Sequence, residues 1–146
     1  MNAAPDPFDL QRFVGAQERV IPEVLDELTQ GRKRTHWMWF VFPQLAALGM
    51  SATAKHYGID SLEEARAYLG HPVLGPRLKQ CCAILLGIDG RSAHDVFGSP
   101  DDLKLRSCLT LFELAAPQEA VFARCLEKYY AGRRDERTVS LCRPAR

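Results

Sequence analysis

The sequence predicts an all-α fold: a single compact domain of about seven short helices in irregular, orthogonal packing, with no sheet. Its 146 residues are 47% apolar and 25% charged, which is typical of one soluble globular domain. Residues that begin and end helices recur along the chain, whereas the two-residue alternation of strands is nearly absent. No internal repeat and no linker is visible. We therefore expect one domain over residues 1–146, with a helical body over 6–132 and a basic C-terminal tail over 133–146.

The first two helices are predicted from a cap and from an apolar stripe. Asp6 followed by Pro7 is a typical start for a short helix that reaches Phe13. Four apolar residues then recur at helical spacing and predict the buried face of a second helix: Val20, Val24, Leu25 and Leu28. Gly31 is expected to end this helix.

The Trp-rich segment at residues 31–44 is the part around which the chain is organised. Its sequence is Gly-Arg-Lys-Arg-Thr-His-Trp-Met-Trp-Phe-Val-Phe-Pro-Gln, and it holds both tryptophans. Thr35 is a candidate N-cap for a helix of about two turns, which should end near Phe42 because the residue before Pro43 disfavours helical geometry. Residues 37–42 have no polar face and should be buried. The polar residues at both ends of the segment should form the rim of a pocket.

The middle of the chain is predicted as a loop followed by two helices. Residues 45–58 are small and mixed in character, and should form a loop. Ser-Leu-Glu-Glu at 61–64 has the spacing of a capping box and begins a helix that ends at Gly70. A long core helix should follow over 72–87, with Pro72 in its first turn and a kink or restart at Gly75-Pro76.

Three further helices are expected in the C-terminal half. Ser92 is a candidate cap for a single turn that ends at Gly98. Ser-Pro-Asp-Asp at 99–102 begins a helix that runs to Phe112, because the helix dipole favours carboxylates in the first turn. Pro117 begins the last long helix, and Gly132 ends it.

Composition also limits the compartment and the chemistry. No apolar stretch approaches the roughly 18 residues of a membrane span, and residues 1–7 lack the features of a signal peptide. We therefore expect a cytoplasmic protein without a membrane partner. The five cysteines are scattered and include no C-x-x-C pair, so we interpret them as small buried hydrophobes. We predict neither a metal site nor a cofactor.

The positive charge of the chain is concentrated at its C-terminus. The net charge is +1, but residues 133–146 carry five arginines against Asp135 and Glu136, which leaves −2 for residues 1–132. A body with this balance is not expected to bind nucleic acid. The tail arginines either contact an acidic partner or are solvated, and solvation is the simpler interpretation: Arg133, Arg134, Arg137, Arg143 and Arg146.

No motif in the chain identifies a standard enzyme mechanism, so the candidate site residues are polar groups at the ends of apolar helices. Lys33 with Arg32 would bind a phosphate or carboxylate at the start of the Trp-rich helix, although a solvated basic stretch explains both residues too. His36 is either a proton donor and acceptor or a core histidine. Trp37 and Trp39 are candidates to stack a ring or to fill the core. Gln44 lies at the opposite end of the segment.

A second group of candidates lies further along the chain. His71 and Arg77 lie on either side of Gly75, whose missing side chain would let a ligand approach the backbone, but capping contacts explain His71 equally well. Lys104, Ser107 and Thr110 are polar and recur close to one face of an apolar helix. Arg106 lies on the same helix but projects in another direction. Such a face is typical of a lined pocket, or of hydroxyls that bond back to their own helix.

Three segments together resemble one family. They are the Trp-rich segment, Glu-Ala-Arg-Ala-Tyr-Leu-Gly-His-Pro-Val-Leu-Gly-Pro-Arg-Leu at 64–78, and Asp-Asp-Leu-Lys-Leu-Arg-Ser-Cys-Leu-Thr-Leu-Phe at 101–112. Over nearly its whole length the chain is similar to the bacterial domain of unknown function 1810, which some genome annotations mislabel calpastatin. The resemblance implies a mainly helical single domain without an established activity. The calpastatin label does not fit, because calpain inhibitors are disordered whereas this chain has the residues for a core.

The order of three motifs is also similar to that of the NADAR group of ADP-ribose N-glycosidases. These motifs are His56-Tyr57, Glu64-Ala65 and the helix that contains Lys104. In that group an acidic residue usually precedes the tyrosine motif, and Lys55 replaces it here, which argues against shared catalysis. The resemblance makes Tyr57 a candidate ligand contact.

Two functional hypotheses follow, and whether the chain is an enzyme is left open. In the first, it binds or processes a phosphorylated, nucleotide-like small molecule related to ADP-ribose, in a pocket where six residues converge: Lys33, His36, Trp37, Lys104, Ser107 and Thr110. Further candidate ligand contacts are Arg32, Gln44, Tyr57 and Arg77. His36 or His71 would move a proton, whereas two-carboxylate glycosidase chemistry is not expected because this set contains no pair of carboxylates. In the second, a non-catalytic domain docks an acidic partner through its basic segments.

Overall fold

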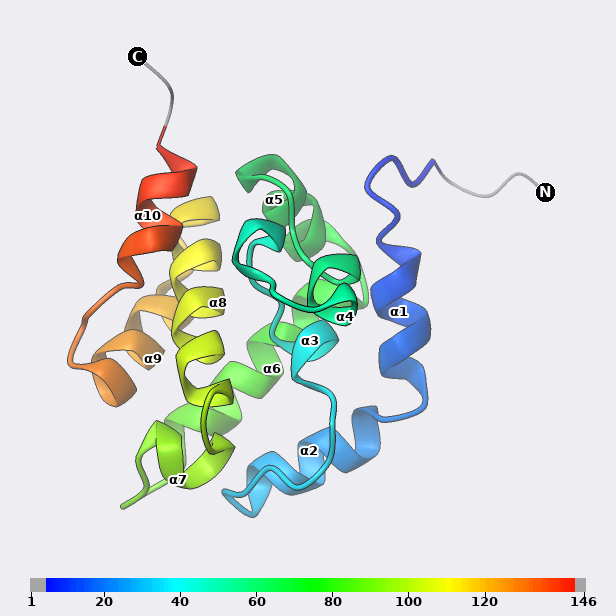
Figure 1. Cartoon of the computed structure of the whole chain (residues 1–146). Helices are drawn as coiled ribbons and strands as arrows, with labels where there is room; N and C mark the ends of the chain where they lie inside the picture. Colours follow the sequence, from blue (N-terminus) through cyan, green and yellow to red (C-terminus); the bar gives the residue numbers. More distant parts are fainter. Residues whose placement is uncertain (1–4, 144–146) are drawn as a thin grey trace.

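The computed structural model describes residues 5–143, and this part of the chain forms ten α-helices and one 3₁₀ helix but no strand (Figure 1). In chain order they are α1 (Gln11–Glu18), α2 (Ile21–Thr29), α3 (Met38–Val41), η1 (Ala46–Leu48), α4 (Ala52–His56), α5 (Leu62–Gly70), α6 (Leu74–Leu86), α7 (Ala93–Phe97), α8 (Asp101–Ala115), α9 (Ala120–Tyr130) and α10 (Glu136–Cys142). The all-α prediction is confirmed. The predicted number of about seven helices is too low, because short helices such as α4 and α10 carry little apolar periodicity. No helix of the described part has the length and apolar character needed to cross a membrane.

Helix α8 is the central element of the fold. It packs against α5, α7, α9 and α10, and Figure 1 shows it between α5 and the pair formed by α9 and α10. Five of its apolar side chains are fully buried, as expected of a helix that neighbours surround on most sides: Leu105, Cys108, Leu109, Leu111 and Phe112. The predicted helix beginning at residues 99–102 is therefore present, and it starts at Asp101.

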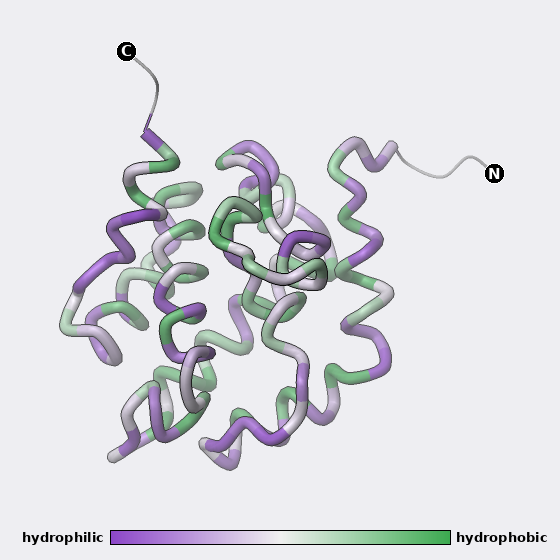
Figure 2. Tube along the Cα trace, in the orientation of Figure 1, coloured by the Kyte–Doolittle hydropathy of each residue, from purple (hydrophilic) through white to green (hydrophobic). Residues whose placement is uncertain are grey.

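The core contains an aromatic cluster centred on Trp37. The Trp37 ring lies 6.1 Å from the Phe42 ring and 6.4 Å from the Phe97 ring, and these two phenylalanines meet edge-on at 5.8 Å. Trp37, Met38, Val41 and Phe42 are buried while Trp39 and Phe40 are half-buried, so one side of the Trp-rich segment reaches the surface. In Figure 2 the hydrophilic stretches that lead into α3 and into α10 run along the outside of the molecule.

Several helices begin later than the sequence predicts, among them α9, which starts at Ala120 and not at Pro117. Asp6 does act as a cap, because its carboxylate accepts hydrogen bonds from the backbone N–H groups of Leu10 and Gln11 at 2.8 and 3.0 Å, but α1 starts only at Gln11. The Trp-rich helix α3 starts at Met38 and not at Thr35. The Thr35 hydroxyl donates to the Glu27 carboxylate at 2.6 Å, and no side chain caps α3.

The stretch predicted as a loop at residues 45–58 is more ordered than expected. Ser51 accepts a hydrogen bond from the Ala54 N–H at 3.1 Å and caps α4, and η1 precedes it. An isolated parallel bridge joins Leu45 to Ile59. The stretch therefore returns on itself and holds its two ends together.

The predicted helix over 72–87 is present as α6, but it begins at Leu74 and continues without a restart. Gly75 and Pro76 both lie in its first turn. Backbone nitrogens in a first turn make no hydrogen bond within the helix, so a proline there costs none. The bond that caps this turn comes from His71, whose Nδ1 accepts from the N–H groups of Val73 and Leu74 at 3.1 and 3.3 Å.

Over the residues that the structure describes, the basic tail includes a packed helix, while Arg133, Arg134, Arg137 and Arg143 are exposed to solvent as expected. Asp135 caps α10 through the Thr138 N–H, and Thr138 is fully buried. The Asp135 N–H in turn donates to the Thr110 hydroxyl of α8 at 2.9 Å, and Arg134 pairs with Glu113 of the same helix. The prediction of a tail over 133–146 is corrected accordingly, because α10 packs on α8. Arg146 lies outside the described residues.

We expect Gly75→Ala to lower the free energy of unfolding by about 2 kcal/mol or more. A Cβ at this position would lie 2.0 Å from the backbone oxygen of Leu69, so α5 and α6 would have to move apart. Gly70→Ala is the matched control, since its Cβ would meet nothing within 4 Å and alanine favours the helix by up to about 1 kcal/mol. Urea unfolding of both variants measures the difference, and equal stabilities would contradict the close approach.

Candidate functional site

Glu27 fixes the chain that leads into the candidate site. It lies on the buried face of α2, where its carboxylate accepts hydrogen bonds from the N–H groups of Arg34 and Thr35, the Thr35 hydroxyl and the Trp37 indole, at 2.6–3.1 Å. Burial raises the pKa of Glu27, but the hydrogen bonds outweigh burial and leave this pKa below its ordinary value. The carboxylate is therefore ionised at neutral pH and holds residues 34–37 in one conformation.

This conformation separates the candidate residues of the Trp-rich segment. Trp37 is fully buried and bonded to Glu27, so it belongs to the core and cannot stack on a ligand at the surface. Arg32 and His36 are exposed, and the His36 ring lies 6.5 Å from the ring of the half-buried Trp39. Trp39 is thus the tryptophan that reaches the surface.

Lys33 and Lys104 converge on one carboxylate. The Lys33 ammonium lies 3.1 Å from one Asp101 oxygen, and the Lys104 ammonium lies 3.6 Å from the other. Each lysine also lies over an indole ring, Lys33 over Trp37 at 5.1 Å and Lys104 over Trp39 at 5.7 Å. The Lys33 side chain is only 8% exposed whereas that of Lys104 is 28% exposed. Lys33 therefore neutralises Asp101, and Lys104 is the cation that a ligand can reach.

Lys104 lies in a hollow of about 500 Å³ that we call the α8 groove. Residues from four parts of the chain line it: Gln44, Leu48, Met50, Ser51, Ala54, Pro100, Leu103, Lys104, Arg106, Ser107, Asp135 and Arg137. Met50 and Leu103 are among the most exposed large apolar residues of the described chain, at 95% and 51%. The groove thus combines an apolar rim with three cations and one carboxylate, a mixture suited to an amphipathic anion.

A narrow cavity adjoins the α8 groove, with which it shares Gln44, Ala54 and Lys104. Its other lining residues include Trp39 and Tyr57, and its volume of about 10 Å³ leaves room for little more than one water molecule. The Tyr57 ring packs against the Phe40 ring at 5.3 Å. Tyr57 therefore lies close to the groove but behind its wall.

Three of the candidate residues make contacts within the scaffold instead of lining the α8 groove. The Thr110 hydroxyl is fully buried and donates to the Arg106 carbonyl at 2.8 Å. Arg77 approaches the buried Gln17 at 3.5 Å, and His71 caps α6. Among the described residues that line the groove there is no histidine, so neither His36 nor His71 is part of its lining.

One family model matches nearly the whole chain. The model of the family "Protein of unknown function (DUF1810)" matches residues 7–142. The chain belongs to the DUF1810 family. The chain is also similar to a solved structure, that of the conserved hypothetical protein Rv1873 from Mycobacterium tuberculosis, with 55% identity and a TM-score of 0.94 over 96% of this chain and 100% of that one. Among the curated proteins, no match to the chain was found.

The sequence did not identify two arginines that line the α8 groove of this DUF1810 chain. Arg106 projects away from the face of Lys104 and Ser107 on a helical wheel, yet it lines the same groove because α10 packs beside α8. Arg137 lies in the segment predicted as a tail. A detectable signal existed for Glu27, which falls three residues after Val24 on an apolar helical face where an unpaired carboxylate is not tolerated.

The cysteines of this DUF1810 chain are not candidate nucleophiles. Burial raises the pKa of Cys81 to about 12, and it also raises the pKa of Cys108. A hydrogen bond with Cys125, together with burial, raises the pKa of Cys82. The interpretation as buried hydrophobes is confirmed for these four thiols, whereas Cys142 on α10 is only half-buried. In the described part of the chain, no three His, Cys, Asp or Glu side chains come together as a metal site requires.

We expect Glu27→Gln to lower the free energy of unfolding of this DUF1810 chain by about 3 kcal/mol at neutral pH, because an amide NH₂ would face donors that now meet an oxygen. Because the pKa is lowered on folding, the stabilisation is fully present above the ordinary value of 4.5 and is lost as the pH falls through the folded pKa. The difference from wild type should therefore shrink below pH 4.5. Denaturant titrations at several pH values measure it.

Asp26→Asn is the control for Glu27→Gln. Asp26 is the exposed neighbour on the same helix, and its carboxylate accepts one hydrogen bond, from Gln30 at 3.0 Å. A change within about 0.5 kcal/mol is expected for this surface substitution. If Glu27→Gln were no more destabilising than the control, Glu27 would not hold the segment.

Proposed function

We propose that this protein binds a phosphorylated, nucleotide-like small molecule, related to ADP-ribose, in the α8 groove. One observation carries the proposal: Gln44, Lys104 and Ser107, which are candidate ligand contacts from distant parts of the sequence, line the same groove. Two of them come from one face of α8, and the third comes from the chain that follows α3. Convergence of polar groups in a partly apolar hollow is the usual arrangement of a small-molecule site.

The groove offers complementary parts for such a ligand. Lys104, Arg106 and Arg137 provide three cations for a phosphate, and the one lining carboxylate, Asp135, is engaged as the cap of α10. Leu48, Met50 and Leu103 provide apolar surface on which a base could lie. A nucleotide has both a flat apolar part and a compact anion, so it would use both sides of the groove.

The proposal is one of binding and not of a reaction. The proton-transfer roles of His36 and His71 find no support in the groove, because His36 is exposed beside Trp39 and His71 is occupied as a cap. Docking of an acidic partner through residues 31–37 is also not proposed, since Trp37 is buried and this segment presents no aromatic patch. What supports ligand binding is the α8 groove alone.

We expect a thermal-shift screen of ADP-ribose, NAD, nucleotides and sugar phosphates to find a ligand that stabilises the wild type, by roughly 2.7 kcal/mol at 100 times its dissociation constant. Lys104→Met should remove most of this shift while changing the stability without ligand by less than about 1 kcal/mol, because methionine fills a similar volume and the ion pair with Asp101 is partly exposed.

Lys79→Met is the matched control for this experiment. It also removes one partly exposed lysine, which pairs with Glu119 at 2.8 Å and does not line the α8 groove. This variant should keep the full ligand shift. A flat screen, or a Lys104→Met protein that binds as well as wild type, would end the proposal.

A further inference from the structure

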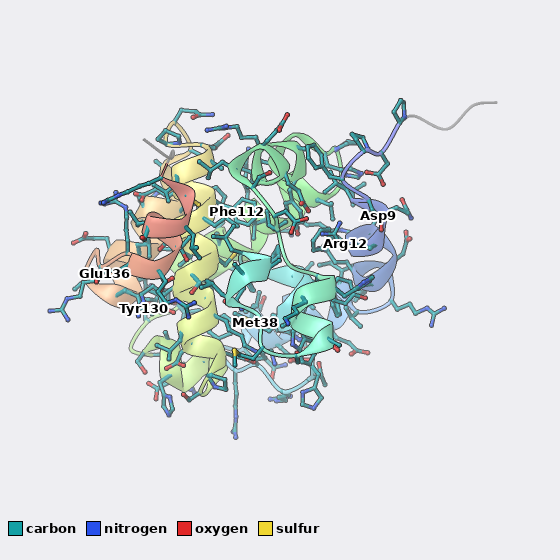
Figure 3. The ribbon with its side chains drawn as sticks, turned by 45° about the horizontal axis from the view of Figure 1, so that its top comes forward. Asp9, Arg12, Met38, Phe112, Tyr130 and Glu136 are labelled. Carbon is teal, nitrogen blue, oxygen red and sulfur yellow. The ribbon has the colours of Figure 1, made fainter. Side chains whose placement is uncertain are left out.

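A second hollow lies directly beside the α8 groove, between α8 and α10. It has a volume of about 740 Å³, and we call it the arginine groove because guanidinium groups dominate its lining: Arg106, Arg133, Arg134, Asp135, Glu136, Arg137, Val139, Ser140 and Arg143. Figure 3 shows Tyr130 and Glu136 on this side of the molecule, where α10 lies along α8. Packing of α10 on α8 therefore creates a basic hollow from residues that are scattered in the sequence.

Most of the positive charge in the arginine groove is uncompensated. Five arginines line it against two carboxylates. Arg134 is paired with Glu113, and Asp135 is occupied by Thr138. Within the described residues, the other four arginines make no ion pair: Arg106, Arg133, Arg137 and Arg143. Uncompensated guanidinium groups around a concave surface attract an anion and can bind its oxygens in pairs.

The Arg106 side chain is positioned beside the arginine groove by the Tyr130 ring. Its guanidinium carbon lies 5.9 Å from the centre of the Tyr130 ring, and the Tyr130 hydroxyl donates to the Asp102 carbonyl, which fixes the ring. The Arg106 Nε atom is buried and is the one buried side-chain nitrogen or oxygen of the described residues without a hydrogen-bond partner. An unpaired buried donor is unfavourable. A bound anion that accepts a hydrogen bond from this guanidinium would remove that cost.

The two grooves are continuous, since Arg106, Asp135 and Arg137 line both. We propose that the ligand carries a diphosphate, with its ring system in the α8 groove and its phosphate chain crossing Arg106 and Arg137 into the arginine groove, where Arg133 and Arg143 hold the distal phosphate. This inference rests on the proposed function and names its ligand class. A single phosphate group presents three terminal oxygens, too few for four guanidinium forks, whereas a diphosphate supplies more oxygens and more charge.

The test compares AMP, ADP and inorganic pyrophosphate by calorimetry with the full chain. Wild type should bind ADP about tenfold more tightly than AMP or better, because the second phosphate adds charge-assisted hydrogen bonds. The double variant Arg133→Gln/Arg143→Gln should lose this advantage and bind pyrophosphate more weakly by a similar factor. Its affinity for AMP should stay unchanged, since neither residue lines the α8 groove.

Arg19→Gln/Arg124→Gln is the matched control. Arg19 lies at the C-terminal end of α1 and Arg124 lies in α9, and both are exposed. Neither lines either groove, so the control removes the same charge without changing the site. It should retain the preference for ADP. If the control lost as much affinity as Arg133→Gln/Arg143→Gln, the effect would be one of net charge and the inference would be overturned.

The outcomes separate this inference from the proposed function. Equal affinities of wild type for AMP and ADP would overturn the diphosphate and leave nucleotide binding in place. Binding of pyrophosphate that depends on Arg133 and Arg143, without binding of any nucleotide, would end the proposed function and overturn the ring system in the α8 groove, while the arginine groove would remain a diphosphate site. Binding of a poly-glutamate peptide but not of pyrophosphate would show that the groove docks an acidic peptide, and the diphosphate would be rejected.

Discussion

A single buried carboxylate determines how the N-terminal third of this protein is arranged. Glu27 lies among apolar residues on α2, and such a charge is tolerated only if donors surround it. The four donors all come from residues 34–37, so the chain must pass over this point. That path puts Trp37 into the core and turns Lys33 towards Asp101 at the start of α8. The core and the edge of the α8 groove therefore depend on the same interaction.

Hydrogen bonds from polar side chains also position other short helices. Arg12 donates from α1 to the carbonyls of His56 and Gly58 and to the Glu64 carboxylate, at 2.8–2.9 Å, and it lies on the inner side of α1 in Figure 3. Gln17 likewise bonds the Phe40 carbonyl and the Tyr68 hydroxyl. Helices of one or two turns are marginal by themselves, so their positions are set by these tertiary bonds more than by local propensity. Glu64 also shows the consequence for prediction. Ser61 caps α5 through the Glu64 N–H as expected, but the Glu64 carboxylate accepts from the Asp60 N–H and pairs with Arg12, not with the Ser61 N–H that would close the capping box.

Helix α8 links the scaffold to both candidate grooves. One side of it supplies buried leucines to the core, while Lys104, Arg106 and Ser107 line hollows that other elements complete. The α8 groove exists because α4 and its flanking chain lie on one side of the helix, and the arginine groove exists because α10 lies on the other. A ligand in either groove would therefore contact the central helix directly, and the packing of α10 would influence both.

The sequence by itself determined the fold class, most of the helices and three residues of the α8 groove. These features have local causes: caps at Ser92 and Ser61, glycines at helix ends, and helical spacing that places Lys104 and Ser107 on one face. The sequence indicated neither the partners of Glu27 and Arg12 nor the recruitment of Arg106 and Arg137. These depend on which segments meet in space, because a buried charge can be paired by donors anywhere in the chain. The packing of α10 on α8 was decided only by the tertiary structure, where buried Thr138 and the bond from Asp135 to Thr110 turn an apparently solvated basic tail into one wall of the candidate site.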